Sequence, residues 1–188
     1  NGGMNARSCM DRPHQFRWTN RPNKYQLIVP RVSSERRHYI PVGLSDREII
    51  LTNQVQAVYD PEPHMFGILN SKIHMSWVRL ITGRMRTDFR YTAGLCWNSF
   101  PFPDISSKEK EAIFQSSISI IQARENHPER NLAALYDPDK MPEDLLAAHT
   151  ELDQVVDNIY RISGFHDDDE RLELLFDLYA KMTGGENA

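Results

Sequence analysis

The chain has 188 residues, of which 40% are hydrophobic and 26% charged, and its formal net charge is -4. This length suits one well-filled core or two small domains, and the composition is that of a folded protein, which excludes wholesale disorder. No run approaches the roughly 18 apolar residues of a membrane span, and the polar first residues do not form a signal peptide, so we expect a cytoplasmic protein without a membrane partner.

Short strands and one long helix are predicted for the first half of the chain. The helix covers residues 64–83, because apolar residues recur there at steps of three and four and Gly83 suits the position after its end. The strands follow from β-branched and aromatic content between Pro, Gly, Asn and Asp, and they cover residues 24–30, 36–42, 48–51, 55–59 and 93–100.

The second half predicts three amphipathic helices. Ser106 and Glu109 form a capping box that begins a helix ending at about Arg124. Pro142 suits the first turn of the next helix, whose apolar stripe ends at Gly164. A second capping box over residues 167–170 begins the last helix, which Gly184 closes.

The two halves also carry opposite charge. Residues 1–103 hold 14 Lys and Arg against 7 Asp and Glu, a net of +7, whereas residues 104–188 hold 8 against 19, a net of -11. We therefore expect an α+β fold: a domain of mixed strands and helices over residues 1–103, then a small α-helical bundle over residues 104–188. Arginine dominates the basic half, and its guanidinium suits phosphates and guanine edges. Charge alone leaves polyanion binding and plain solvation equally open.

No self-sufficient active site is recognisable in the sequence. It contains no G-x-G-x-x-G, no Walker A loop and no nucleophile elbow. The seven histidines do not have the spacing of metal ligands, and the acids of HDDDE at residues 166–170 fit a helix start. Cys9 and Cys96 are expected to stay reduced thiols. We predict no catalytic residue, no metal ligand and no cofactor in this chain.

The segment IVPRVSSERRHYIPVG, residues 28–43, is the first candidate for recognition. In an extended segment alternate side chains share a face, which would place Glu35, Arg37 and Tyr39 together. An arginine can bond guanine O6 and N7 while a glutamate accepts from the paired cytosine, so we expect these three to read bases. The alternative is a solvated edge strand with a weak ion pair. The neighbours expected to hold the DNA backbone are Arg31, Ser33, Ser34 and Arg36.

A second basic segment, RLITGRMRTDFRY, covers residues 79–91. Arginines just past a helix end lie in a loop with free donors, as contacts to the DNA backbone do. The alternative is that they neutralise the helix C-terminus, which accounts for Arg79 and Arg84 but hardly for the others. The candidates for DNA backbone contacts are Arg84, Arg86, Arg90 and Tyr91.

Together with GLCWNSFPFPD, residues 94–104, these segments resemble the C-terminal part of the large bacterial restriction-modification proteins of the MmeI-like type. In that family an endonuclease domain, a helical connector and an N6-adenine methyltransferase precede a target-recognition domain and a C-terminal helical domain. The resemblance extends from about residue 25 to residue 183. Its further motifs are NLAALYDPDKMPEDLLAAHTELDQVVDNIY and ERLELLFDLYAKMTG.

The resemblance implies sequence-specific recognition of double-stranded DNA by the first half, with Glu35 and Arg37 as a base-reading pair. This chain lacks the Asn-Pro-Pro-aromatic methylation motif, so we expect it to be non-catalytic alone. S-adenosylmethionine, and Mg²⁺ for cleavage, are implied only for the parent protein. The expected partners are double-stranded DNA and a methyltransferase domain or subunit. A second hypothesis is a protein-interaction scaffold whose acidic helices dock a separate methyltransferase.

Overall fold

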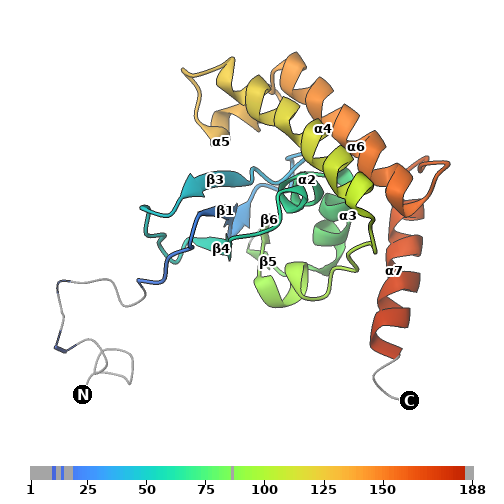
Figure 1. The fold of residues 1–188 in the computed structure, drawn as a ribbon, viewed down its shortest axis with the longest axis horizontal. Helices are drawn as coiled ribbons and strands as arrows, with labels where there is room; N and C mark the ends of the chain where they lie inside the picture. Colours follow the sequence, from blue (N-terminus) through green and yellow to red (C-terminus); the bar gives the residue numbers. More distant parts are fainter. Residues whose placement is uncertain (1–9, 12–13, 15–18, 86, 185–188) are drawn as a thin grey trace.

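The computed structural model describes residues 10–11, 14, 19–85 and 87–184 and has an α+β fold, as predicted. Figure 1 shows the strands gathered on one side, with α4 and α6 running together across the top and α7 descending beside α3. The elements are β1 (Tyr25–Pro30), β2 (Val32–Ser33), β3 (Gly43–Asp46), β4 (Val55–Tyr59), α2 (His64–Leu69), α3 (Lys72–Ile81), β5 (Arg84–Met85), β6 (Asp88–Arg90), a π-helix (Ala93–Trp97), α4 (Ser107–Glu125), α5 (Leu132–Leu135), α6 (Glu143–Tyr160) and α7 (Asp168–Gly184).

The first sheet has the order β3-β1-β4, and both pairs are antiparallel. The central strand β1 buries Leu27 and Val29, which agrees with the predicted strand over residues 24–30, and β4 lies where a strand over 55–59 was expected. Residues 48–51 are not a strand. Their backbone is held instead by the buried Gln26, whose Nε2 donates to the carbonyl of Ile49 at 2.9 Å.

The second sheet has the order β2-β6-β5 and is also antiparallel. The predicted strand over residues 36–42 is wrong: the chain turns, with the Arg37 amide donating to the Ser34 carbonyl at 3.2 Å, and β3 begins only at Gly43. The strand-like composition has another cause, because Tyr39 and Ile40 are buried in the core at 5% and 2% exposure.

The predicted helix over residues 64–83 is broken into α2 and α3. Asn70 ends α2, and its Nδ2 donates back to the Phe66 carbonyl at 2.8 Å. Ser71 begins α3 as its N-cap, with its side chain accepting from the amide of His74. The predicted strand over residues 93–100 is also wrong, because residues 93–97 form a short π-helix that buries Cys96.

The three helices predicted for the second half are confirmed. The capping box at the start of α4 is complete, since Ser106 and Glu109 bond each other's backbone amides. At α7 only half of the predicted box forms: Asp167 accepts from the Glu170 amide at 2.9 Å, whereas the Glu170 carboxylate accepts from the amide of His166.

One hydrophobic core joins the two halves of the chain. Helices α2 and α3 of the first half pack against α4, α6 and α7 of the second. The predicted division into domains near residue 103 stays a prediction, and the core crosses it. Within the described ranges no helix has both the length and the apolar character needed to cross a bilayer.

Candidate nucleic-acid interface

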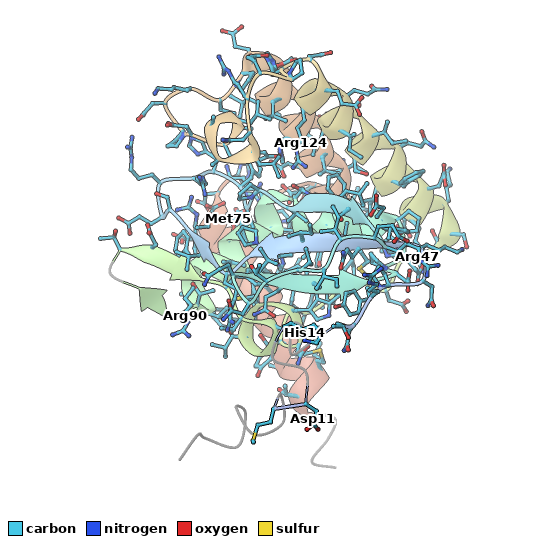
Figure 2. The ribbon with its side chains drawn as sticks, turned by 90° about the vertical axis from the view of Figure 1, so that its left-hand side faces the viewer. Asp11, His14, Arg47, Met75, Arg90 and Arg124 are labelled. Carbon is cyan, nitrogen blue, oxygen red and sulfur yellow. The ribbon has the colours of Figure 1, made fainter. Side chains whose placement is uncertain are left out.

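The pairing of β2 with β6 brings together the two arginine-rich segments found in the sequence. Val32 lies opposite Arg90, and Ser33 lies opposite Phe89. Strand β5, which contains Arg84, pairs with the other side of β6. We call residues 31–38 together with residues 84–85 and 87–90 the arginine surface. In Figure 2 Arg90 and Arg47 lie at opposite ends of the strands, so this surface is separate from Arg47.

The turn at the centre of this surface is formed by residues 34–37. The hydrogen bond from the Arg37 amide to the Ser34 carbonyl closes it, and Arg36 and His38 are exposed. Because the chain turns here, the alternation expected for an extended segment does not apply. Glu35 and Arg37 lie half-buried in or beside the turn, whereas Tyr39 points away from it into the core.

Arg79, near the C-terminal end of α3, holds the backbone of residues 34–37 by hydrogen bonds. Its Nη2 donates to the Arg37 carbonyl at 2.7 Å and its Nη1 to the Glu35 carbonyl at 3.5 Å. The guanidinium also lies 5.6 Å from the ring centre of Phe89 on β6. Arg79 therefore joins both parts of the arginine surface. In the sequence Arg79 is only a basic residue near a helix end, so its contacts with both segments could not be predicted.

The arginines of the turn donate hydrogen bonds to oxygen atoms of the protein. Arg36 donates to both carboxylate oxygens of Asp139 at 2.7 and 2.8 Å, and both side chains are 64% exposed. Arg37 donates to the Ser33 hydroxyl at 3.3 Å and to the Ala133 carbonyl at 3.4 Å. Exposed ion pairs contribute at most about 1 kcal/mol, so phosphate oxygens can replace such partners. The Arg36 side chain is therefore available to a polyanion, whereas Arg37 is half-buried.

Three of the residues predicted to contact DNA have buried side chains in this structure. Ser33 is 3% exposed within β2, Tyr39 is 5% exposed and Tyr91 is 2% exposed. The hydroxyl of Tyr39 donates to Asp153 Oδ2 at 2.7 Å, and that of Tyr91 bonds His74 Nε2 at 3.2 Å. Burial raises the pKa of both tyrosines well above its usual range. Their side chains serve the core rather than the surface.

The other predicted DNA backbone contacts that the structure describes lie on or beside the arginine surface. Arg31 is half-buried and donates to the Asn53 carbonyl at 3.0 Å, and Arg90 is exposed at the end of β6. Arg84 lies in β5, while Arg86 lies outside the described residues.

The buried histidines are packed rather than ligating. His74 and His149 are fully buried, and burial lowers the pKa of each to about 3, so both are neutral at pH 7. Among the residues that the structure describes, no three or more His, Cys, Asp or Glu side chains are placed to hold a metal ion.

Two family models match the chain in succession. The model described as the MmeI target recognition domain matches residues 3–104, and the model of the MmeI C-terminal domain matches residues 105–185. DNA methyltransferase A of Bacillus subtilis (strain 168) is 45% identical over 171 residues, which are 91% of this chain and 19% of that protein.

A solved structure is also similar over nearly the whole chain. The Type IIL restriction-modification enzyme MmeI, in complex with DNA, superposes with a TM-score of 0.91 at 37% identity, over 98% of this chain and 25% of that one. The chain therefore spans about a fifth of the curated relative's length and a quarter of the solved one. The chain belongs to the MmeI family, and it corresponds to the target recognition domain and the C-terminal domain that follows it.

Proposed function

We propose that this chain recognises a specific sequence in double-stranded DNA for an adenine-N6 methyltransferase of a bacterial restriction-modification system. The observation that carries the proposal is the arginine surface, because the β2–β6 pairing joins basic segments that are distant in sequence. Arginine suits this role, since its planar guanidinium bonds phosphates and guanine edges in pairs. The relative solved with DNA supports the same class of ligand. Such a protein acts in the bacterial cytoplasm.

Within this surface we assign two kinds of contact. Glu35 and Arg37 read base edges from the turn, where Arg37 addresses guanine and Glu35 the paired cytosine. Arg31, Arg36, Arg84 and Arg90 hold phosphates and fix the register of the chain on the duplex. Ser34, half-buried at the start of the turn, belongs to the second group. Tyr39, Tyr91 and Ser33 are left out because they are buried.

The catalytic chemistry is assigned to a methyltransferase domain or subunit. The methyl donor S-adenosylmethionine, and Mg²⁺ where cleavage occurs, belong to that partner in this proposal. The sequence has no Asn-Pro-Pro-aromatic motif, and the described residues offer no cluster of metal ligands.

Binding of duplex DNA should depend steeply on salt. If about five phosphates are neutralised, the logarithm of the affinity falls against the logarithm of salt concentration with a slope near -4.5. Fluorescence anisotropy of a labelled duplex at several NaCl concentrations measures this slope. Arg90→Ala should reduce it by about 1, whereas Arg47→Ala, at the other end of the first sheet, should leave it unchanged. A flat salt response in the wild-type chain would exclude the proposal.

Substitutions in the turn should change sequence preference. Glu35→Ala or Arg37→Ala should relax the preference at one base pair, at a loss of about 1–3 kcal/mol for the correct base only. Sequencing the duplexes retained from a pool with a randomised centre measures this preference. Arg36→Ala is the matched control, because loss of a phosphate contact weakens all sequences equally. If Glu35→Ala and Arg37→Ala also weaken all sequences equally, neither residue reads bases.

A further inference from the structure

The turn that carries Glu35 and Arg37 lies between two buried residues. Ser33, before it, is 3% exposed and pairs with Phe89 on β6, and Tyr39, after it, is 5% exposed. The residues between them are half-buried or exposed. How well the turn is placed relative to DNA therefore depends on what holds these two ends.

Asp153 on α6 holds the second end. Its side chain is buried, at 7% exposure for the residue, and Oδ2 accepts from the Tyr39 hydroxyl at 2.7 Å. Its other oxygen, Oδ1, accepts from the backbone amide of Lys72 at 2.6 Å, at the first residue of α3. A carboxylate also suits this position because the N-terminus of a helix carries partial positive charge. One carboxylate thus joins the end of the turn to the start of α3.

Helix α3 leads back to the same turn. Arg79, in its last turn, donates to the carbonyls of Arg37 and Glu35. Asp153 therefore acts on the turn by two routes, directly through Tyr39 and indirectly through α3 and Arg79. Displacement of α6 relative to the first half of the chain would shift both supports together.

The Tyr39 ring is fixed as well. It stacks on His149 of α6 with ring centres 4.0 Å apart and an interplanar angle of 21°. His149 is itself held at both nitrogens, because Nδ1 donates to the Asn70 carbonyl at 3.0 Å and Nε2 accepts from the Tyr136 hydroxyl at 2.7 Å. Burial raises the pKa of Asp153 to about 6, so it is mostly ionised at neutral pH and can accept both bonds.

An open groove of about 820 Å³ is bordered by His38, Tyr39, Arg79 and Asp153, and by the buried Arg171 of α7. The groove reaches the residues that hold the second end of the turn, whereas residues 34–37 do not line it. At this end the hydrogen bonds of Asp153 add directional contacts to the stacking of Tyr39 on His149.

We propose that Asp153 is a positioning residue for base recognition, through which the C-terminal helices fix the turn that carries Glu35 and Arg37. The proposal rests on the proposed function, because its main readout is sequence preference. It assigns to α6 a part in selectivity although Asp153 does not touch the DNA.

Tyr39→Phe is the first test, because it removes only the hydroxyl and leaves a ring to stack on His149. We expect the enrichment of preferred duplexes from a randomised pool to fall about fivefold, the factor that follows from losing one buried hydrogen bond. Hydrogen exchange of the Arg37 amide should become faster by a similar factor. The slope of binding against salt should not change, because the phosphate contacts remain.

Tyr160→Phe is the matched control. Tyr160 lies on α6, as Asp153 does. Its hydroxyl donates to the Pro101 carbonyl at 3.1 Å, away from the turn. It should lower thermal stability to a similar extent and leave both readouts unchanged. Asp153→Asn retains an oxygen for the Lys72 amide and an NH₂ group for the Tyr39 oxygen, so its preference should lie closer to wild type than that of Tyr39→Phe.

Two outcomes separate the positioning role from the proposed function. If the wild-type chain enriches a sequence but Tyr39→Phe behaves like Tyr160→Phe in preference and in exchange, Asp153 has no positioning role and the proposed function stands. If the wild-type chain retains no duplex at all, the proposed function fails, and the assignment to base recognition fails with it.

Discussion

Arg171→Met should lower the free energy of unfolding by about 3–5 kcal/mol, the largest effect that we expect from one substitution. Arg171 on α7 and Asp157 on α6 are each 6% exposed. The guanidinium donates to both carboxylate oxygens, with Nη2–Oδ2 at 2.5 Å and Nε–Oδ1 at 3.2 Å. Removing it leaves a buried carboxylate without its cation, and desolvation of that charge is no longer compensated.

Denaturant unfolding followed by circular dichroism measures this loss. Lys110→Met is the control, because Lys110 and Glu62 are similarly close, at 2.6 Å, but 37% and 59% exposed. That change should lower stability by less than about 1 kcal/mol. The double variant Arg171→Met with Asp157→Leu should recover much of the loss, because the carboxylate that lost its cation is removed as well. Equal losses for Arg171→Met and Lys110→Met would show that burial does not decide the contribution of the pair.

Gly67→Ala should lower the free energy of unfolding by about 2–3 kcal/mol through overpacking. A Cβ atom at this position of α2 would lie 2.4 Å from Cγ2 of Ile113 on α4 and 3.2 Å from Cδ1 of Leu152 on α6. Ile113 and Leu152 are both fully buried, so neither has open space into which to move. The better helix propensity of alanine, worth about 1 kcal/mol, offsets only part of this strain.

Gly83→Ala is the control for this prediction. Gly83 is exposed, and a Cβ atom there would meet nothing within 4 Å. Its stability should stay within about 0.5 kcal/mol of wild type, as for most surface changes. Thermal and denaturant unfolding of both variants provide the comparison. An unchanged stability for Gly67→Ala would mean that α2 and α4 can separate without loss.

The helices of the second half were predictable because their signals are local. The capping box at Ser106 and Glu109 is satisfied within one helical turn, and the apolar stripe of α6 depends only on its own sequence. The break between α2 and α3 also has a local signal, since Asn70 and Ser71 are residues that end and begin helices. The apolar periodicity continues across the break, and for this reason a single helix was predicted.

The turn could not be predicted in the same way. Tyr39 and Ile40 are typical of strands, but both are buried in the core, and Tyr39 packs against α6, more than 100 residues later in the chain. The bond from Tyr39 to Asp153 spans 114 positions, and no pattern in either segment indicates it. The arginine clusters were visible in the sequence, whereas Arg79 as their connection depends on how α3 packs. Local composition indicated where the arginines gather but not which side chains are buried and which are exposed.

The way in which Arg79 holds the turn has a consequence for how recognition can change in evolution. Arg79 bonds the carbonyl oxygens of residues 35 and 37, not their side chains. Every amino acid presents this oxygen, so the support survives replacement of either side chain. The side chains at positions 35 and 37 can therefore vary while Arg79 keeps the backbone of the turn in the same position. Under the proposed assignment of residues 35 and 37 to base reading, a new target would need substitutions at these two positions and no change in the residues that hold the turn.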